Sequence, residues 1–319
     1  TASVLLLLPV NFNLKFRLPE PADPGTVSVI IQPIPGQAVD DNCSTTLTSV
    51  SRQIFLNTNN EGTYDIVFLP IEDAADLSQV TSVVNPCNLT NGAKYVFKLA
   101  YSDAFGNAEA STFLQIVFDS VALNPSLTAP LENAVLRSNF DFEFTLLEDA
   151  MPNMLKLTGT YQSGPTSDSL GARVITFADS VRETGNHKVE FVSLSTLASD
   201  SADVASVSPD GDFVHKGVYL LSLSFQDLAT NNAVEQTVTV SFDTQTDPPQ
   251  IASPGANDFL PEQFYVNFSL PEVASTAGVT ITFLKILSLT AFGFEEEYFT
   301  THTITANITA AGDYSILVP

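Results

Sequence analysis

Three segments of the chain alternate strictly between apolar and polar residues, and they are copies of one pattern. Asn11–Glu20 recurs as Asn139–Glu148 and again as Gln263–Glu272, at offsets of 128 and 124 residues. A period of two puts every second side chain on the same face, so each segment predicts a half-buried β-strand. Self-similarity at a fixed spacing indicates a chain built from repeated modules.

A second repeated block begins with a glycine and continues into another predicted strand. Its copies are Gly62–Phe68, Gly185–Phe191 and Gly312–Val318. Glycine before a run of alternating residues is typical of a tight turn that leads into a strand. Each module is therefore expected to contain at least these two strands.

A third block predicts a β-hairpin and occurs twice, over Tyr95–Asp119 and Tyr219–Asp243. The predicted turns are Asp103–Asn107 and Asp227–Asn231. Asp and Asn tolerate left-handed backbone conformations and bond their own backbone, so they favour a turn between alternating flanks. Tyr, turn Asp, turn Asn and closing Asp keep the same spacings in both copies, which makes this block the most specific pattern in the chain.

The order of Tyr, strand, Asp-x-x-Gly-Asn turn, strand and Phe-Asp resembles the final hairpin of bacterial-type immunoglobulin-like, or fibronectin-III-like, repeats. The second copy departs from it, with Thr230 where the first has Gly106. The resemblance implies tandem repeats of an extracellular surface or filament glycoprotein. It implies a fold and a location more than an activity.

The expected fold class is all-β, with tandem immunoglobulin-like β-sandwiches joined by short Pro-rich linkers. The predicted modules are 1–122, 123–247 and 248–319, and the third is expected to be incomplete because no third hairpin follows Gly312–Val318. Either the sequence is part of a longer array, or a neighbouring subunit completes the sandwich at its open sheet edge. In the second case the donor strand is expected in the apolar N-terminal segment formed by Val4, Leu5, Leu6, Leu7 and Leu8.

The charge of the chain limits the kinds of molecule that it is expected to bind. With 36 acidic and 12 basic residues the net charge is −24, which disfavours nucleic acid and anionic membranes as partners. No apolar run approaches the ~18 residues of a membrane span, so no membrane insertion is expected. The acidic residues are interpreted first as a solvated surface, without a metal or other cofactor. The alternative is Ca²⁺ bound by hard carboxylate ligands, with the weak candidates Asp119, Asp210, Asp212, Asp243 and Asp247.

The two cysteines, Cys43 and Cys87, fall in the same predicted module, and a disulfide between them is the favoured interpretation. Two buried thiols or a partial metal site are the alternatives. Glycosylation motifs of the type Asn-x-Ser/Thr suggest N-linked glycans, with acceptor residues at Asn42, Asn88, Asn267 and Asn307.

No nucleophile elbow, phosphate loop or paired-Cys zinc pattern occurs, so the chain is predicted not to be an enzyme. The favoured function is a structural protomer of an extracellular glycosylated filament, appendage or cell-surface layer, which assembles head to tail with copies of itself. A stalk of an adhesin or lectin that binds a glycan, protein or surface partner is one alternative. An accessory part of a larger secreted enzyme is another.

Overall fold

The structure, a computed structural model, describes residues 6–34, 51–68, 73–74, 77–274, 279–284, 289–290, 293–294 and 301–318. Almost all of its regular structure is β-strand, as the alternation predicts. The chain divides into two compact units, 1–243 and 244–319. Three separate clusters of buried apolar side chains lie in the predicted modules 1, 2 and 3.

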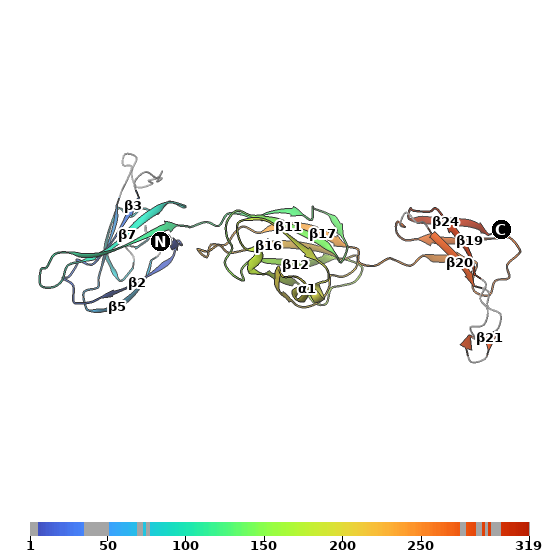
Figure 1. Cartoon of the computed structure of the whole chain (residues 1–319), viewed down its shortest axis with the longest axis horizontal. Helices are drawn as coiled ribbons and strands as arrows, with labels where there is room; N and C mark the ends of the chain where they lie inside the picture. Colours follow the sequence, from blue (N-terminus) through green and yellow to red (C-terminus); the bar gives the residue numbers. More distant parts are fainter. Residues whose placement is uncertain are drawn as a thin grey trace. The chain divides into compact units, whose positions relative to one another are not determined.

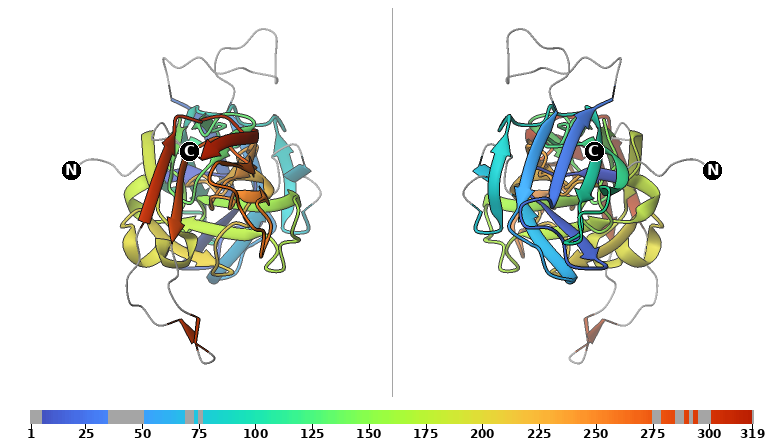
Figure 2. Two further views of the ribbon diagram at one scale, coloured as in Figure 1. Left: turned by 90° about the vertical axis from the view of Figure 1, so that its right-hand side faces the viewer. Right: turned by 90° about the vertical axis from the view of Figure 1, so that its left-hand side faces the viewer.

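Module 1 consists of a six-stranded sheet and a two-stranded sheet. The strand order in the large sheet is β1-β8-β7-β3-β4-β6, and β2 pairs with β5 in the other. These last two strands lie side by side in blue in the right-hand view of Figure 2. The elements are β1 (Leu6–Leu8), β2 (Phe12–Leu18), β3 (Ser28–Pro33), β4 (Arg52–Leu56), β5 (Gly62–Phe68), β6 (Val80–Val84), β7 (Lys94–Tyr101) and β8 (Ala110–Phe118).

Module 2 repeats this arrangement and is the most extensively described (Figure 1). Its six-stranded sheet has the order β10-β17-β16-β12-β13-β15, and the opposing sheet has the order β14-β11-β9. Its elements are β9 (Ser126–Ala129), β10 (Ala134–Leu136), β11 (Phe140–Leu146), β12 (Lys156–Ser163), β13 (Arg173–Phe177), the 3₁₀ helix η2 (Asp179–Val181), β14 (Gly185–Phe191), α1 (Leu194–Asp200), β15 (Val204–Ser208), β16 (Val218–Ser224) and β17 (Gln236–Phe242).

Module 3 lies in the second compact unit. Strands β18, β19 and β24 form one sheet, β20 pairs with β23, and β21 pairs with β22. The elements are β18 (Gln250–Ser253), β19 (Phe264–Leu270), β20 (Val279–Leu284), β21 (Leu289–Thr290), β22 (Gly293–Phe294), β23 (Thr301–Ala306) and β24 (Gly312–Val318).

The first two sequence blocks pair with each other in every module. β2 with β5, β11 with β14 and β19 with β24 form antiparallel ladders of seven residue pairs each. The glycine of the second block lies opposite the leucine that ends the first strand. Gly185 has a φ of 149°, a conformation that side chains with a Cβ rarely adopt. A glycine at this position lets the backbone turn directly into β14, whose first residue lies opposite Leu146 at the end of β11.

The third block forms the predicted hairpins, β7 with β8 and β16 with β17. The short strands β1 and β10 run parallel to the closing strand of each hairpin. Together these pairings give modules 1 and 2 two facing sheets each, with an apolar core between them, which is an immunoglobulin-like sandwich. The tandem all-β fold expected from the sequence is confirmed.

A buried arginine anchors the core of each of the first two modules, and the sequence patterns do not reveal it. Arg173 of β13 donates from Nε to the carbonyl of Gly211 at 2.7 Å, and its guanidinium forms an ion pair with the buried Asp168. Tyr219 donates to Asp168 from its hydroxyl group at 2.6 Å and accepts the amide of Val214 at 3.0 Å. The guanidinium of Arg173, the carboxylate of Asp168 and the hydroxyl group of Tyr219 all have hydrogen-bond or ion-pair partners, as burial requires.

Module 1 uses the same anchor. Arg52 of β4 is fully buried and donates to the carbonyls of Cys87 and Asn88 at 2.7 and 2.8 Å. The hydroxyl group of Tyr95 accepts the amide of Thr90 at 2.9 Å. In both modules, arginine and tyrosine together hold the loop that precedes the hairpin against the sheet.

Candidate functional site: an acidic cluster after the first module

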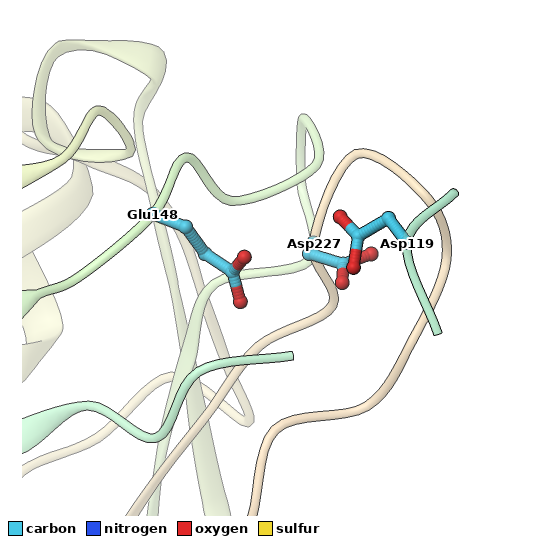
Figure 3. Close-up of side chains that lie close together, drawn as sticks. All are labelled: Asp119, Glu148 and Asp227. Carbon is cyan, nitrogen blue, oxygen red and sulfur yellow. The ribbon is translucent and has the colours of Figure 1, made fainter. Parts of the chain in front are cut away.

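Three carboxylates from distant parts of the sequence meet where module 1 passes into module 2. Asp119 directly follows β8, Glu148 follows β11, and Asp227 begins the turn between β16 and β17. One carboxylate oxygen of each lies within 4.8 Å of those of the others (Figure 3). Within the described ranges this is the one group of three or more acidic, His or Cys side chains with such geometry.

The turn supplies the buried member of the cluster. Asp227 is 1% exposed, and its carboxylate accepts the backbone amide of Asn231 at 2.9 Å and the side-chain amide of Asn231 at 2.8 Å. The same Nδ2 group donates to the backbone carbonyl of Asp119 at 3.1 Å. Asn231 therefore closes the turn and also connects it to the end of β8.

The residues that follow Asp119 are bound to module 2. The amide of Leu123 donates to Glu148, and the side-chain oxygen of Asn124 accepts the amide of Val234 at 3.1 Å. Ala122 is 4% exposed and belongs to the core cluster of module 2. Ala122 thus packs with module 2, and the linker that follows it is bonded to this module.

Burial, together with the crowding of negative charge, raises the pKa of two members of the cluster. Burial, with the nearby Asp227 carboxylate, raises the pKa of Asp119 above its ordinary value. Burial also raises the pKa of Glu148, to which Asp227 and Asp119 contribute, while the bond from the Leu123 amide partly offsets this. Both shifts mean that a proton, or another positive charge, at this position relieves repulsion.

The cluster has the chemistry of a hard-cation site, because carboxylate oxygens are the ligands that Ca²⁺ prefers. Of the weak Ca²⁺ candidates from the sequence, only Asp119 belongs to it. Glu148 and Asp227 were not predicted as ligands, although each stands in a repeated block. The blocks predicted strands and turns but not which turn reaches which strand end, so the sequence pattern could not bring the three together.

The other weak Ca²⁺ candidates have different surroundings. Asp210 is exposed. Asp212 accepts the amide of Leu194 at 2.7 Å and thereby caps the beginning of α1. Asp243 lies 3.5 Å from the ring of His215, and the backbone amide of Asp247 donates to Glu272 at 2.8 Å. None of these four belongs to a cluster of three possible ligands among the described residues.

The predicted donor strand already has a partner in its own module. Leu6, Leu7 and Leu8 form β1 and pair in parallel with Ile116, Val117 and Phe118 of β8. Module 2 has the same pairing between β10 and β17, so β1 is an internal element of the repeat. Donation of this segment to a neighbouring subunit stays a prediction; Val4 and Leu5 lie outside the described residues.

The cysteine and glycosylation predictions are only partly covered. Cys87 is bonded in a disulfide, whereas Cys43 lies outside the described residues, as does Asn42. Asn88 and Asn307 are exposed, and Asn267 is half-buried in β19. The Cys43–Cys87 pairing and the glycans remain predictions.

No family model matches the chain, and no curated sequence matches it. Solved structures that align with it include the FN1–FN3 domains of chicken CNTN1, at 7% identity and a TM-score of 0.24, covering 98% of this chain and 92% of the other. Dimeric latent PorU from Porphyromonas gingivalis aligns at 10% identity and a TM-score of 0.23. That alignment covers 98% of this chain and 28% of the PorU chain. These TM-scores are too low to support an argument, so the class of the protein, a tandem immunoglobulin-like chain, follows from its own strand topology. Among the described residues, no helix is both long and apolar enough to span a bilayer.

Proposed function

We propose that the chain is a structural, non-catalytic subunit of an extracellular glycosylated filament, appendage or cell-surface layer, and that subunits join head to tail. The observation that carries this proposal is the bonded connection between modules 1 and 2. Its contacts to Leu123, Asn124 and Asp119 use both backbone and side-chain groups of the linker. A linker fixed in this way restricts the relative motion of the modules, which suits a spacer more than a hinge.

The surface chemistry supports an exposed, solvated role. A net charge of −24 keeps identical copies from associating at random, so assembly must depend on specific contacts. Exposed acceptor residues such as Asn88 and Asn307 can carry glycans without disturbing a core. The disulfide at Cys87 suits an oxidising compartment outside the cytosol.

Electron microscopy of native material, labelled with antibodies against the chain, tests the proposal. We expect label at a regular repeat along filaments or across a surface layer. Label on discrete particles with no periodicity would contradict a structural polymer and favour a binding or accessory role.

The glycan component has its own test. The intact mass of the native protein should fall after enzymatic removal of N-linked glycans, and peptide mapping should place the loss at Asn88 or Asn307. An unchanged mass would remove glycosylation from the proposal and leave the structural role to the microscopy.

A further inference from the structure

A pocket of about 250 Å³ lies on the outer face of the six-stranded sheet of module 2. Lys156 of β12 and Ser224 of β16 line it and lie opposite each other in the sheet. The next residues inward, Leu157 and Leu223, belong to the core of the module, so Lys156 and Ser224 point outward. The pocket therefore opens to solvent away from the core.

One wall of the pocket is apolar. Phe225 and Ala233 line it and are 3% and 8% exposed, and the amide of Ala233 donates to the carbonyl of Phe225 at 3.0 Å. Met154, which is half-buried, adds a flexible thioether side chain. An apolar wall beside a few convergent polar groups is the usual construction of a small-molecule site.

The polar wall presents both donors and acceptors. The side-chain amide of Gln226 donates to the side-chain oxygen of Asn232 at 2.9 Å, which leaves the Gln226 oxygen as an acceptor and the Asn232 amide as a donor. Glu235 accepts the hydroxyl group of Ser222 at 2.8 Å, and its carboxylate has further acceptor capacity. These groups can serve a ligand without losing the bonds that position them.

The lysine of the pocket distinguishes module 2 from module 1. In the described part of the chain, the ammonium group of Lys156 has neither an ion pair nor a hydrogen bond. Module 1 has Ser28 at the equivalent position of β3, where it is 3% exposed and accepts the side-chain amide of Gln53 at 3.3 Å. The outward lysine of the module 1 sheet, Lys98, is instead paired with Glu109. Lys156 is thus a half-buried donor that the fold itself does not use.

The size and charge of the pocket limit the ligand. A volume of about 250 Å³ equals that of about eight water molecules, at about 30 Å³ each, which suits one sugar ring rather than a longer molecule. Glu235 in the pocket and a net charge of −24 disfavour an anion. Hydroxyl groups both donate and accept, so a neutral polyol matches a wall of mixed donors and acceptors.

We propose that this pocket binds one ring of a neutral saccharide. The Lys156 pocket is lined on its open side by Met154, Lys156, Ser224, Gln226, Asn232 and Glu235. Lys156 and Asn232 donate to ring hydroxyl groups, and Gln226 and Glu235 accept from them. The C–H face of the ring packs against Met154 and the apolar wall. This binding site adds to the proposed structural role and does not depend on it.

The two methionines of the chain provide the readout. Met154 lines the pocket, whereas Met151 does not, so Met151 is an internal control. The intact chain, labelled with ¹³C at the methionine methyl groups, is titrated with glucose, galactose, mannose and N-acetylglucosamine and followed by NMR; Met151→Leu assigns the two signals. We expect a saturable shift of the Met154 signal in the millimolar range with at least one sugar, and little movement of the Met151 signal.

Substitutions locate the binding. Lys156→Ala removes the unused donor and should weaken sugar binding at least tenfold. Asn232→Ala should weaken it severalfold and keeps the test independent of the sheet, since Asn232 is exposed in a turn. Lys98→Ala is the matched control, because Lys98 also points outward from a six-stranded sheet but lies in module 1. It should leave the affinity within twofold.

Glycine and glucuronate, titrated in the same way, test the ligand class. Binding of either at least tenfold tighter than every neutral sugar would overturn a neutral saccharide and indicate recognition of a carboxylate by Lys156. Absence of a saturable shift with all four sugars would overturn the inference, as would equal shifts of the two methionine signals or equal losses in Lys156→Ala and Lys98→Ala. None of these results bears on whether native material forms periodic assemblies, which microscopy decides independently.

Discussion

Modules 1 and 2 anchor the same loop with the same two side chains but use that loop differently. Arg52 and Arg173 both donate to two consecutive backbone carbonyls. Tyr95 and Tyr219 both accept the amide two residues beyond the second of these carbonyls. In module 1 the anchored loop contains the disulfide-bonded Cys87. In module 2 it contains Asp212, which caps α1. The two modules of this chain therefore share the anchor, whereas the loops attached to it differ.

The anchor is best tested by removing its charge. Arg173→Met leaves the buried Asp168 without its ion pair, and breaking one side of a buried pair costs about 3–5 kcal/mol. Urea unfolding of the intact chain should show this loss in free energy of unfolding. The exposed pair of Lys188 and Asp141 is the control, and Lys188→Met should cost less than about 1 kcal/mol. Similar losses in both variants would mean that the buried pair contributes little.

The same pair predicts a pH dependence. Burial by itself raises the pKa of Asp168, but the bonds from Arg173 and Tyr219 outweigh it and lower the pKa below the usual value. The resulting stabilisation is complete above the unfolded-state pKa, near about 3.9, and is lost as pH falls through the lower folded-state value. Unfolding free energies measured from pH 6 downward should fall less steeply in Asp168→Asn than in the unsubstituted chain. Identical slopes would contradict the assignment.

The two tyrosines should differ when their hydroxyl groups are removed. Tyr95→Phe leaves the Thr90 amide without this acceptor, and such a buried loss costs about 1–3 kcal/mol. Tyr219→Phe removes the acceptor of the Val214 amide and also a donor to Asp168, so it should cost more. Burial and the bond to Asp168 raise the pKa of Tyr219 to about 12, so the loss in Tyr219→Phe should not change between pH 7 and 9. A larger loss in free energy of unfolding for Tyr95→Phe than for Tyr219→Phe would contradict this expectation.

The turns between β7 and β8 and between β16 and β17 carry different residues at one equivalent position, which can be exchanged. Gly106 and Thr230 both have left-handed φ values, 78° and 69°, although threonine is β-branched. A left-handed conformation costs an L-residue roughly 1–2 kcal/mol, so Gly106→Thr should lower the free energy of unfolding by about 1 kcal/mol. Thr230→Gly should raise it by less, since glycine also loses more backbone entropy on folding. Melting curves of both variants measure the pair, and losses in both would show that Thr230 is held by favourable contacts.

The smallest effect is expected at the acidic cluster. Because the pKa of Glu148 is raised, its charged form is disfavoured in the folded state at neutral pH, and Glu148→Gln should stabilise the chain by a few tenths of a kcal/mol in chelator. Glutamine retains an oxygen to accept the Leu123 amide. Calcium titration then tests the sequence-based expectation: an ion held by the three carboxylates stabilises the unsubstituted chain more than the variant. Equal stabilisation of both chains by calcium would mean that the three carboxylates do not bind the ion.

Local patterns predicted the regular part of the fold well. The strands around Phe140–Leu146 and Gly185–Phe191, and the hairpin that turns at Asp227, follow from alternation and turn chemistry, which act over a few residues. The pairing of the first two blocks does not follow from those patterns, because many antiparallel registers satisfy the same alternation.

What the patterns missed depends on contacts between distant residues. Arg173 reads as a solvent-facing residue at the start of a strand, and only the loop at Gly211 makes its burial favourable. Asp119, Glu148 and Asp227 come together because three chain segments meet. The pairing of Leu6–Leu8 with the end of β8 is also a contact between distant residues, which the apolar character of the segment does not specify.

The bonded linker also determines how tension would pass along the chain. A pull on the end of β8 reaches Asp119, and from there it acts on the turn through Asn231 and on the end of β11 through Leu123 and Glu148. These attachments must break before the linker can extend, so the joint should resist extension more strongly than a free linker. Single-molecule stretching would register such a joint as a separate rupture event before either sandwich unfolds.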